Sequence, residues 1–276
     1  MAPRIKSLRG QGRVEFLIIA MALLMLILGT IQFALIYQAK ITLNYAAFET
    51  ARAGAVNNAR RWAMELAFAR ALAPLYTNPY LVEKNKTAFG GVLSSGSNFT
   101  NLSCGTNFAL GALATPDLKY EHVKCAREHV REMIVGKQVR ILLVNPGPEA
   151  FAGRLAVATG GGKSLIPNDN LMYRSKVPDP NSGQSIQDAN LIKVHIGLCY
   201  KLVVPLVDRM IARMVALAPT ALEPANFGPA AAGSFAHQCS AAGLGPGVYG
   251  VPIYAHAVMR MQSDPIEDRF CSGQCS

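Results

Sequence analysis

A run of 21 residues without a charged side chain, Phe16 to Ile36, limits what this chain can fold into more than any other feature. A helix needs about 20 such residues to cross a bilayer, and core helices of soluble proteins are rarely apolar on all sides for so long. A cleaved secretory signal is the main alternative, but its apolar part spans about 7–15 residues before a cut site of small residues. Here Tyr37-Gln-Ala-Lys40 follows, which is a poor cut site. We therefore predict a retained transmembrane helix over residues 11–36.

The charge of the chain is concentrated before this run. Lys and Arg number 27 against 17 Asp and Glu, a net charge of +10, and residues 1–13 hold four basic residues and no acid. Basic residues favour the cytoplasmic side of a membrane helix, so we expect residues 1–10 in the cytoplasm and everything from about residue 37 in the periplasm. No dense basic cluster with interleaved aromatic residues follows, which predicts a lipid bilayer as partner and no nucleic acid.

Glu15 stands at the entry to the apolar run, where a carboxylate is costly to desolvate. It could lie at headgroup level beside Arg13. Alternatively, Arg9-Gly10-Gln-Gly-Arg-Val-Glu-Phe16 resembles the class III signal of prepilins in Flp/Tad tight-adherence systems. In that family a prepilin peptidase cuts after a Gly, the mature chain has Glu at its fifth position, and an aromatic residue follows. A cut after Gly10 would make Gln11 the first residue, Glu15 the fifth and Phe16 the sixth, although the major Flp pilins usually have Tyr there.

The start Gly10 to Phe16, the apolar run and the segment Thr42-Leu-Asn-Tyr-Ala-Ala-Phe-Glu-Thr-Ala-Arg-Ala-Gly-Ala55 together resemble the TadE-type pseudopilins. The resemblance covers about residues 10–56. It implies a pilin-like α+β fold and a non-catalytic minor pilin or pseudopilin that takes part in pilus assembly. The partners implied are a prepilin peptidase, other pilins and pseudopilins bound through the N-terminal helix, and an inner-membrane assembly platform. An unprocessed, membrane-anchored periplasmic scaffold of the same apparatus is the alternative.

The absence of proline between Pro3 and Pro74 predicts that the membrane helix continues into the periplasm over residues 37–76, as one helix from about residue 14 to 73. Apolar residues recur there in steps of three and four. We expect this stripe to pack on the protein's own domain. Its members are Tyr37, Ile41, Tyr45, Phe48, Ala51, Ala55, Ala59, Trp62, Leu66 and Ala69.

Residues 77–276 are expected to form a periplasmic, disulfide-containing α+β domain whose antiparallel sheet packs against the long helix. Apolar spacing predicts helices over 119–135 and 206–215. β-rich or alternating segments predict strands over 138–144, 192–202 and 251–261. Residue 195 would lie on the polar face of the second strand, and long loops are expected near 77–118, 159–190 and 219–247.

Six cysteines follow the predicted membrane helix, and an even number in an oxidising compartment indicates disulfides. Six cysteines allow 15 connectivities. Proximity in the sequence favours the pairs Cys104–Cys125, Cys199–Cys239 and Cys271–Cys275. A zinc site is disfavoured because no Cys-x-x-Cys occurs and the histidines are scattered, so we expect no metal and no cofactor.

Three other segments have residues found in active or binding sites, and none fits such a site well. Gly160-Gly-Gly-Lys-Ser164 lacks the first glycine and the following helix of a phosphate-binding loop. The Asp and Asn residues at 168–190 lack the order of a calcium loop, and turn chemistry explains them equally well. His195 has no nucleophile or acid nearby in the sequence, so we expect no enzymatic activity.

Overall fold

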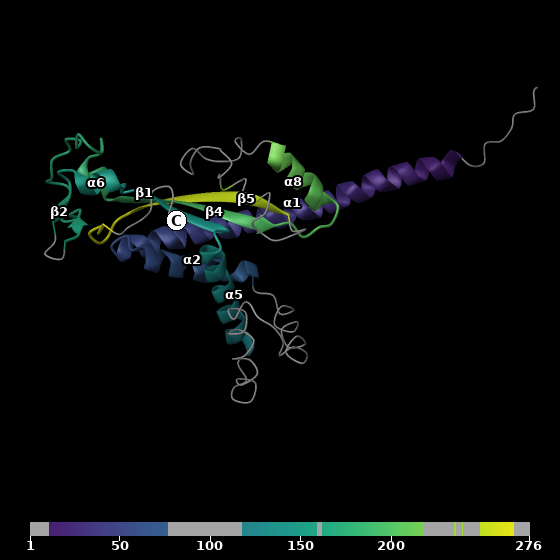
Figure 1. Cartoon of the computed structure of the whole chain (residues 1–276), viewed down its shortest axis with the longest axis horizontal. Helices are drawn as coiled ribbons and strands as arrows, with labels where there is room; N and C mark the ends of the chain where they lie inside the picture. Colours follow the sequence, from purple (N-terminus) through teal and green to yellow (C-terminus); the bar gives the residue numbers. More distant parts are fainter. Residues whose placement is uncertain are drawn as a thin grey trace, which may run out of the picture.

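The first helix, α1 (Gln11–Val56), projects from one end of the molecule and continues along the domain (Figure 1). The computed structural model describes residues 11–76, 118–158, 162–217, 235, 239 and 249–267. The N-terminal half of α1 projects away from the other elements, whereas its C-terminal half packs along a sheet. This is the predicted combination of a long N-terminal helix and a small antiparallel sheet, so the α+β fold class is confirmed.

The long helix ends at Val56, and a second helix, α2 (Arg61–Tyr76), follows after a sharp turn. The prediction of one continuous helix was wrong at this point. Asn58 and Ala59 have φ angles of 58° and 56°, in the left-handed region that ends a helix. Pro74 lies inside α2 rather than at its end. The turn brings α2 back alongside α1, so that both helices face the sheet (Figure 1).

Residues near the C-terminus hold this turn in place. The backbone N–H of Asn58 donates to Ser263 Oγ at 2.8 Å, and its side-chain amide donates to the carbonyl of Asp264 at 2.8 Å. Ser263 Oγ in turn donates to the carbonyl of Ala55 at 3.0 Å, at the end of α1. These bonds satisfy carbonyl and amide groups that a helix terminus leaves without intrahelical partners, and they connect segments about 200 residues apart.

The sheet has three antiparallel strands in the order β1 (Val139–Asn145), β4 (Leu191–Lys201) and β5 (Gly250–Arg260). All three coincide with the predicted strands. In the register, Ile196 of β4 lies opposite Ile141 of β1 and Ala255 of β5. The helix α5 (Leu118–Val135) precedes β1 and packs against α2.

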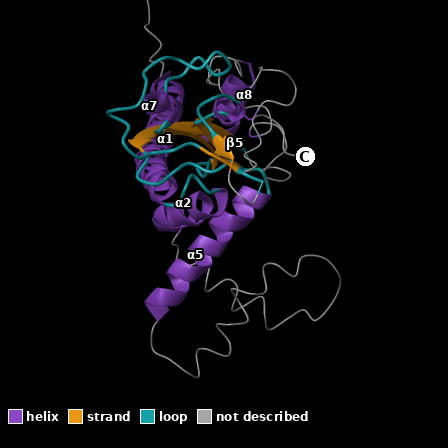
Figure 2. Ribbon diagram, turned by 90° about the vertical axis from the view of Figure 1, so that its left-hand side faces the viewer, coloured by secondary structure: helices purple, strands orange, loops and turns teal. Residues whose placement is uncertain are grey.

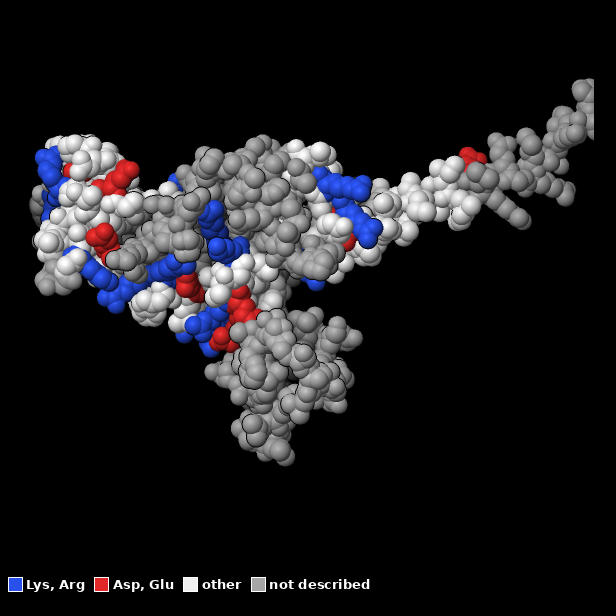
Figure 3. Space-filling view, in the orientation of Figure 1, with Lys and Arg blue, Asp and Glu red and all other residues white. Residues whose placement is uncertain are grey.

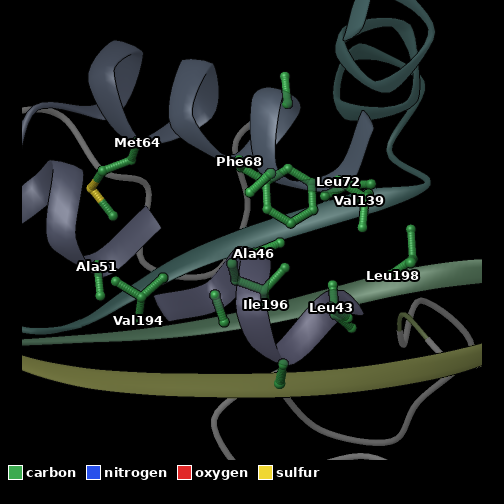
Figure 4. Packing of buried hydrophobic residues seen from close by; sticks show 14 of the residues in the cluster. Leu43, Ala46, Ala51, Met64, Phe68, Leu72, Val139, Val194, Ile196 and Leu198 are labelled. Atoms are coloured by element: carbon green, nitrogen blue, oxygen red, sulfur yellow. The ribbon is translucent and has the colours of Figure 1, made fainter. Parts of the chain in front are cut away.

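The main core lies between α1 and α2 on one side and one face of the sheet on the other (Figure 4). Alanines on α1 let the helix approach the strands closely, while larger side chains from α2 and β4 fill the space between them. The residues labelled there are Leu43, Ala46, Ala51, Met64, Phe68, Leu72, Val139, Val194, Ile196 and Leu198.

The second face of the sheet is partly covered, which the alternating sequence of β4 did not indicate: His195 and Cys199 are buried, whereas His256 and Val258 of β5 on the same face are exposed. Cys199, Phe235, Cys239 and Tyr254 form a separate buried cluster on this side. The helix α8 (Val207–Leu217) lies on the side of the sheet opposite α2 (Figure 2). His195 is only 8% exposed, so its placement on a solvent-facing polar strand face was wrong.

Short elements gather at the end of the molecule farthest from the start of α1 (Figure 1). They have their own small core around Ile166 and Ile186. These elements are α6 (Pro148–Ala152), β2 (Val157–Ala158), β3 (Ser164–Leu165) and α7 (Ile186–Ala189).

Candidate membrane-anchoring and assembly segment

The N-terminal half of α1 is long and apolar enough to cross a membrane, and the protein leaves it bare. The most apolar 18-residue window has a mean hydropathy of 2.5, and only 6% of that window is buried. Phe16, Ile19, Leu23 and Leu26 are all exposed large apolar residues. A soluble core helix would bury such residues, so this helix requires an apolar environment that the chain itself does not supply.

Three of the four predicted processing residues, Gln11, Glu15 and Phe16, lie at the tip of this bare helix. Gly10 is outside the described residues, and Gln11 is the first residue of α1. Glu15 and Phe16 are both exposed on the helix surface. Their position at the projecting end leaves them far from the sheet and accessible to other proteins (Figure 1).

The C-terminal half of α1 is attached to the domain by its small residues. Ala39, Ala47 and Ala51 are fully buried, as is Leu43 between them. The stripe predicted from the sequence was partly right: its alanines, including Ala51, are buried, whereas its large members are not. Tyr37 is 68% exposed, and Ile41, Tyr45 and Phe48 of the predicted stripe are exposed as well. Alanine allows helix and sheet backbones to lie close together, so the small residues face inward and the large apolar residues remain outside.

Lys40 fixes α1 to the edge strand just beyond the apolar run. Its Nζ donates a hydrogen bond to the backbone carbonyl of Tyr254 in β5. Partial burial lowers the pKa of Lys40 below its usual value. The ammonium group of Lys40 is therefore part of the contact between α1 and the sheet.

A groove between α1 and α2 opens beside the exposed residues of α1. Glu49 and Arg52 form an ion pair at 3.7 Å on the α1 side. The groove contains carboxylate and guanidinium groups but neither a histidine nor a cysteine, so it has no arrangement typical of nucleophilic catalysis. Its lining consists of Tyr45, Glu49, Arg52, Ala53, Val56, Ala67, Arg70, Ala71 and Pro74.

Gln32, the one amide of the apolar run, is fully buried. Its Oε1 accepts hydrogen bonds from the backbone N–H groups of Val203 and Val204, at 3.1 and 2.9 Å. Val203 and Val204 lie in the turn between the end of β4 and the start of α8. A single side chain therefore ties the turn before α8 to the part of α1 that is predicted to lie in the membrane.

The candidate disulfide residues are divided between described and undescribed parts of the chain. Cys199 of β4 and Cys239 form a disulfide with a Cα–Cα distance of 5.4 Å, which is one of the three favoured pairs. The thiols of Cys104, Cys125, Cys271 and Cys275 lie outside the described residues, so their pairing stays a prediction. The bridge joins the second face of the sheet to the segment that contains Phe235.

The acidic and amide residues of 168–190 hold the fold together. Asp179 accepts backbone N–H bonds from Arg154, Asn181 and Ser182. Burial raises the pKa of Asp179, but these donors and the Arg154 guanidinium outweigh it and hold the pKa below its ordinary value. Asp188 forms a capping box with Ser185 at the start of α7.

Neither ligand-binding motif considered from the sequence forms a site in the part of the chain that the structure describes. No three His, Cys, Asp or Glu side chains gather there as a metal site would require. Lys163 of the glycine-rich segment is exposed and Ser164 lies in β3, while Gly160 and Gly161 are outside the described residues. The motif therefore does not form the strand–loop–helix that a phosphate-binding loop requires.

The fold and the bare helix together define an α+β protein anchored to a membrane by a single N-terminal helix. Residues 10–52 match the family model described as TadE-like protein. The match agrees with the resemblance stated from the sequence, and it concerns this segment alone. It covers most of α1 and none of the sheet. No curated protein and no solved structure matches the chain.

Proposed function

We propose that this protein is a non-catalytic minor pilin, or pseudopilin, that takes part in assembly of a Flp/Tad-type pilus. The observation that carries the proposal is the division of α1 into two parts. The part up to about residue 27 is apolar and bare, and the rest packs against α8 and the sheet. A subunit built this way can exchange lipid for neighbouring helices without unfolding its domain.

The bare end of α1 is suited to processing and assembly. In this proposal a prepilin peptidase removes residues 1–10 on the cytoplasmic side and leaves Gln11 as the new amino terminus. The carboxylate of Glu15 then pairs with the amino terminus of a neighbouring subunit. A buried carboxylate without such a partner costs several kcal/mol, so the pairing would set the register between subunits.

The exposed apolar residues beyond the membrane run supply a surface for lateral contacts. Tyr37, Ile41, Tyr45 and Phe48 lie on one side of α1, and each is about half exposed or more. Large contiguous apolar patches on a protein surface usually mark interaction sites. This patch continues the apolar run, so helices of other pilins and pseudopilins can pack along both. The assembly platform in the inner membrane would present the subunit to them.

We place the protein in the inner membrane as a single-pass subunit, with its N-terminus in the cytoplasm and its domain in the periplasm. The four basic residues before the apolar run support this orientation. The Cys199–Cys239 disulfide supports it as well, because such bonds persist mainly in oxidising compartments.

Complementation of a deletion strain tests the proposal. We expect that the deletion reduces pili in the sheared surface fraction, and that the wild-type gene restores them. The variants Gly10→Ala and Glu15→Gln should fail to restore them, whereas Gly12→Ala, which changes a glycine outside the cut site, should restore them. Full restoration by Gly10→Ala and Glu15→Gln would contradict the proposal and favour an unprocessed scaffold.

A further inference from the structure

The helix α8 has large apolar side chains on two sides, and the domain's own packing buries only one of them. Val207, Ile211 and Val215 are buried against α1 and the end of the sheet. A neighbouring flank of the same helix presents large apolar side chains to the outside. Its exposed members are Met210, Met214 and Leu217, and the exposed Leu206 directly precedes the helix.

The charges of α8 border this apolar flank. Arg209 and Arg213 are both exposed and one turn apart. At 100° per residue they lie on either side of the position opposite the buried Ile211, and Arg213 is next to Leu217 of the apolar flank. Figure 3 shows basic side chains gathered at the end of the domain from which α1 projects. An exposed apolar flank with arginines along its edge is typical of helices that lie in a membrane interface.

The position along α1 of its contact with α8 determines how deep α8 would lie in a bilayer. Its buried face packs with Leu28, Leu35 and Ile36. A run from Phe16 to Ile36 is about 30 Å long, which equals the thickness of the hydrocarbon layer. The contact therefore covers roughly the last 12 Å of the run, in the leaflet from which α1 emerges.

Gln32 holds α8 at this depth. It lies between the contact residues of α1, and its Oε1 accepts from the N–H groups of Val203 and Val204. Backbone amides near the hydrocarbon layer lack water as a partner and cost several kcal/mol when unpaired. The bond to Gln32 satisfies them, so the turn before α8 can lie close to the acyl chains.

We propose that α8 is an interfacial membrane helix. Its exposed flank of Met210, Met214 and Leu217, together with Leu206, would insert into the leaflet from which α1 emerges, and Arg209 and Arg213 would contact anionic phospholipid headgroups. Two elements then hold the domain at the membrane. The helix α1 sets the direction of its long axis, and α8 sets its rotation about that axis. The inference requires that α1 crosses the membrane, and it does not depend on the proposed role in pilus assembly.

Depth-dependent fluorescence quenching of the full chain tests this proposal. The native tryptophan is removed by Trp62→Phe, and Met214→Trp or Met172→Trp is introduced. Met172 is the matched control, since it is an exposed methionine in the segment between β3 and α7. A third variant, Leu24→Trp, reports insertion of α1. Each variant is reconstituted in phosphatidylcholine–phosphatidylglycerol vesicles that contain lipid brominated near the headgroup or deep in the chains.

We expect that lipid brominated near the headgroup quenches Met214→Trp at least about twofold more than Met172→Trp, and more than lipid brominated deeply does. The added changes Arg209→Glu and Arg213→Glu should reduce this quenching. Equal quenching of Met214→Trp and Met172→Trp, in samples where Leu24→Trp shows an inserted α1, would overturn the proposal. Shielding of Met214→Trp that appears only in cross-linked dimers would also overturn it, because a second copy would then cover the flank.

Discussion

Gly54 of α1 lies directly against Ile192 of β4. A Cβ atom built on Gly54 would be 2.5 Å from Ile192 Cδ1 and 3.1 Å from Met64 Sδ of α2. Gly54 is therefore a point where α1, α2 and β4 pack closely together. The absence of a side chain at this position lets all three pack together.

We predict that Gly54→Val destabilises the protein by about 1–3 kcal/mol through overpacking, since the ends of two side chains must move. Thermal unfolding in detergent measures the effect. Gly29→Val is the matched control, because nothing lies within 4 Å of a Cβ at Gly29 on the same helix. Equal melting temperatures for the two variants would show that the close approach at Gly54 is not needed.

The strands and most helices were predictable because their side chains repeat with the period of one regular structure. Ile192, Val194, Ile196 and Leu198 alternate with other residues, and they all face the main core. The break after Val56 was not predictable in the same way. Asn58 and Ala59 carry no glycine or proline signal, and the turn depends on hydrogen bonds that Asn58 donates to residues 263 and 264.

The faces of the elements were harder to predict than the elements themselves. The predicted stripe combined large residues such as Tyr45 and Phe48 with alanines such as Ala51, because both follow helical spacing. The structure buries only the alanines of these and leaves Tyr45 and Phe48 exposed. The burial of His195 was also missed, because the alternation in β4 indicated a solvent-facing second side. That side is partly covered, around Cys199 by Phe235 and Cys239 from a distant part of the sequence.

Gln32→Leu should loosen the contact between α8 and α1. The change leaves the N–H groups of Val203 and Val204 without their acceptor, which costs about 1–3 kcal/mol for a buried donor. Hydrogen exchange in detergent should show faster exchange at these two amides. Gln38→Leu, on the exposed side of α1, should leave them unchanged. Unchanged protection in Gln32→Leu would contradict this account of the buried amide.

Asp179 should make the stability of the domain depend on acid pH. Its pKa is lower in the folded protein than in the unfolded chain, so ionised Asp179 stabilises the fold above the unfolded pKa of about 3.9. This contribution disappears as pH falls through the folded pKa. Asp179→Asn should therefore lower the melting temperature at neutral pH, and its difference from wild type should shrink in acid. The exposed Asp169→Asn should show little effect, and a pH-independent deficit in Asp179→Asn would contradict the account.

Reduction of the Cys199–Cys239 bridge should weaken the covering of the second sheet face. The two cysteines are 40 residues apart, and the chain-entropy model assigns about 4 kcal/mol to a loop of that length. Peptide mapping without reductant should recover the two cysteines in one linked pair. The double variant Cys199→Ser, Cys239→Ser should lower the melting temperature to about that of the reduced protein. Recovery of Cys199 linked to another cysteine would contradict this structure.

The mature N-terminus tests the proposed pilin role most directly. Intact-mass and N-terminal analysis of protein from native membranes should find a chain that begins at Gln11, and the Gly10→Ala variant should keep its leader. Gly12→Ala should be processed like the wild type. A wild-type chain that still begins near Met1 would contradict the account and leave a plain anchored scaffold, and a start beyond Tyr37 would show that the apolar run is a secretory signal.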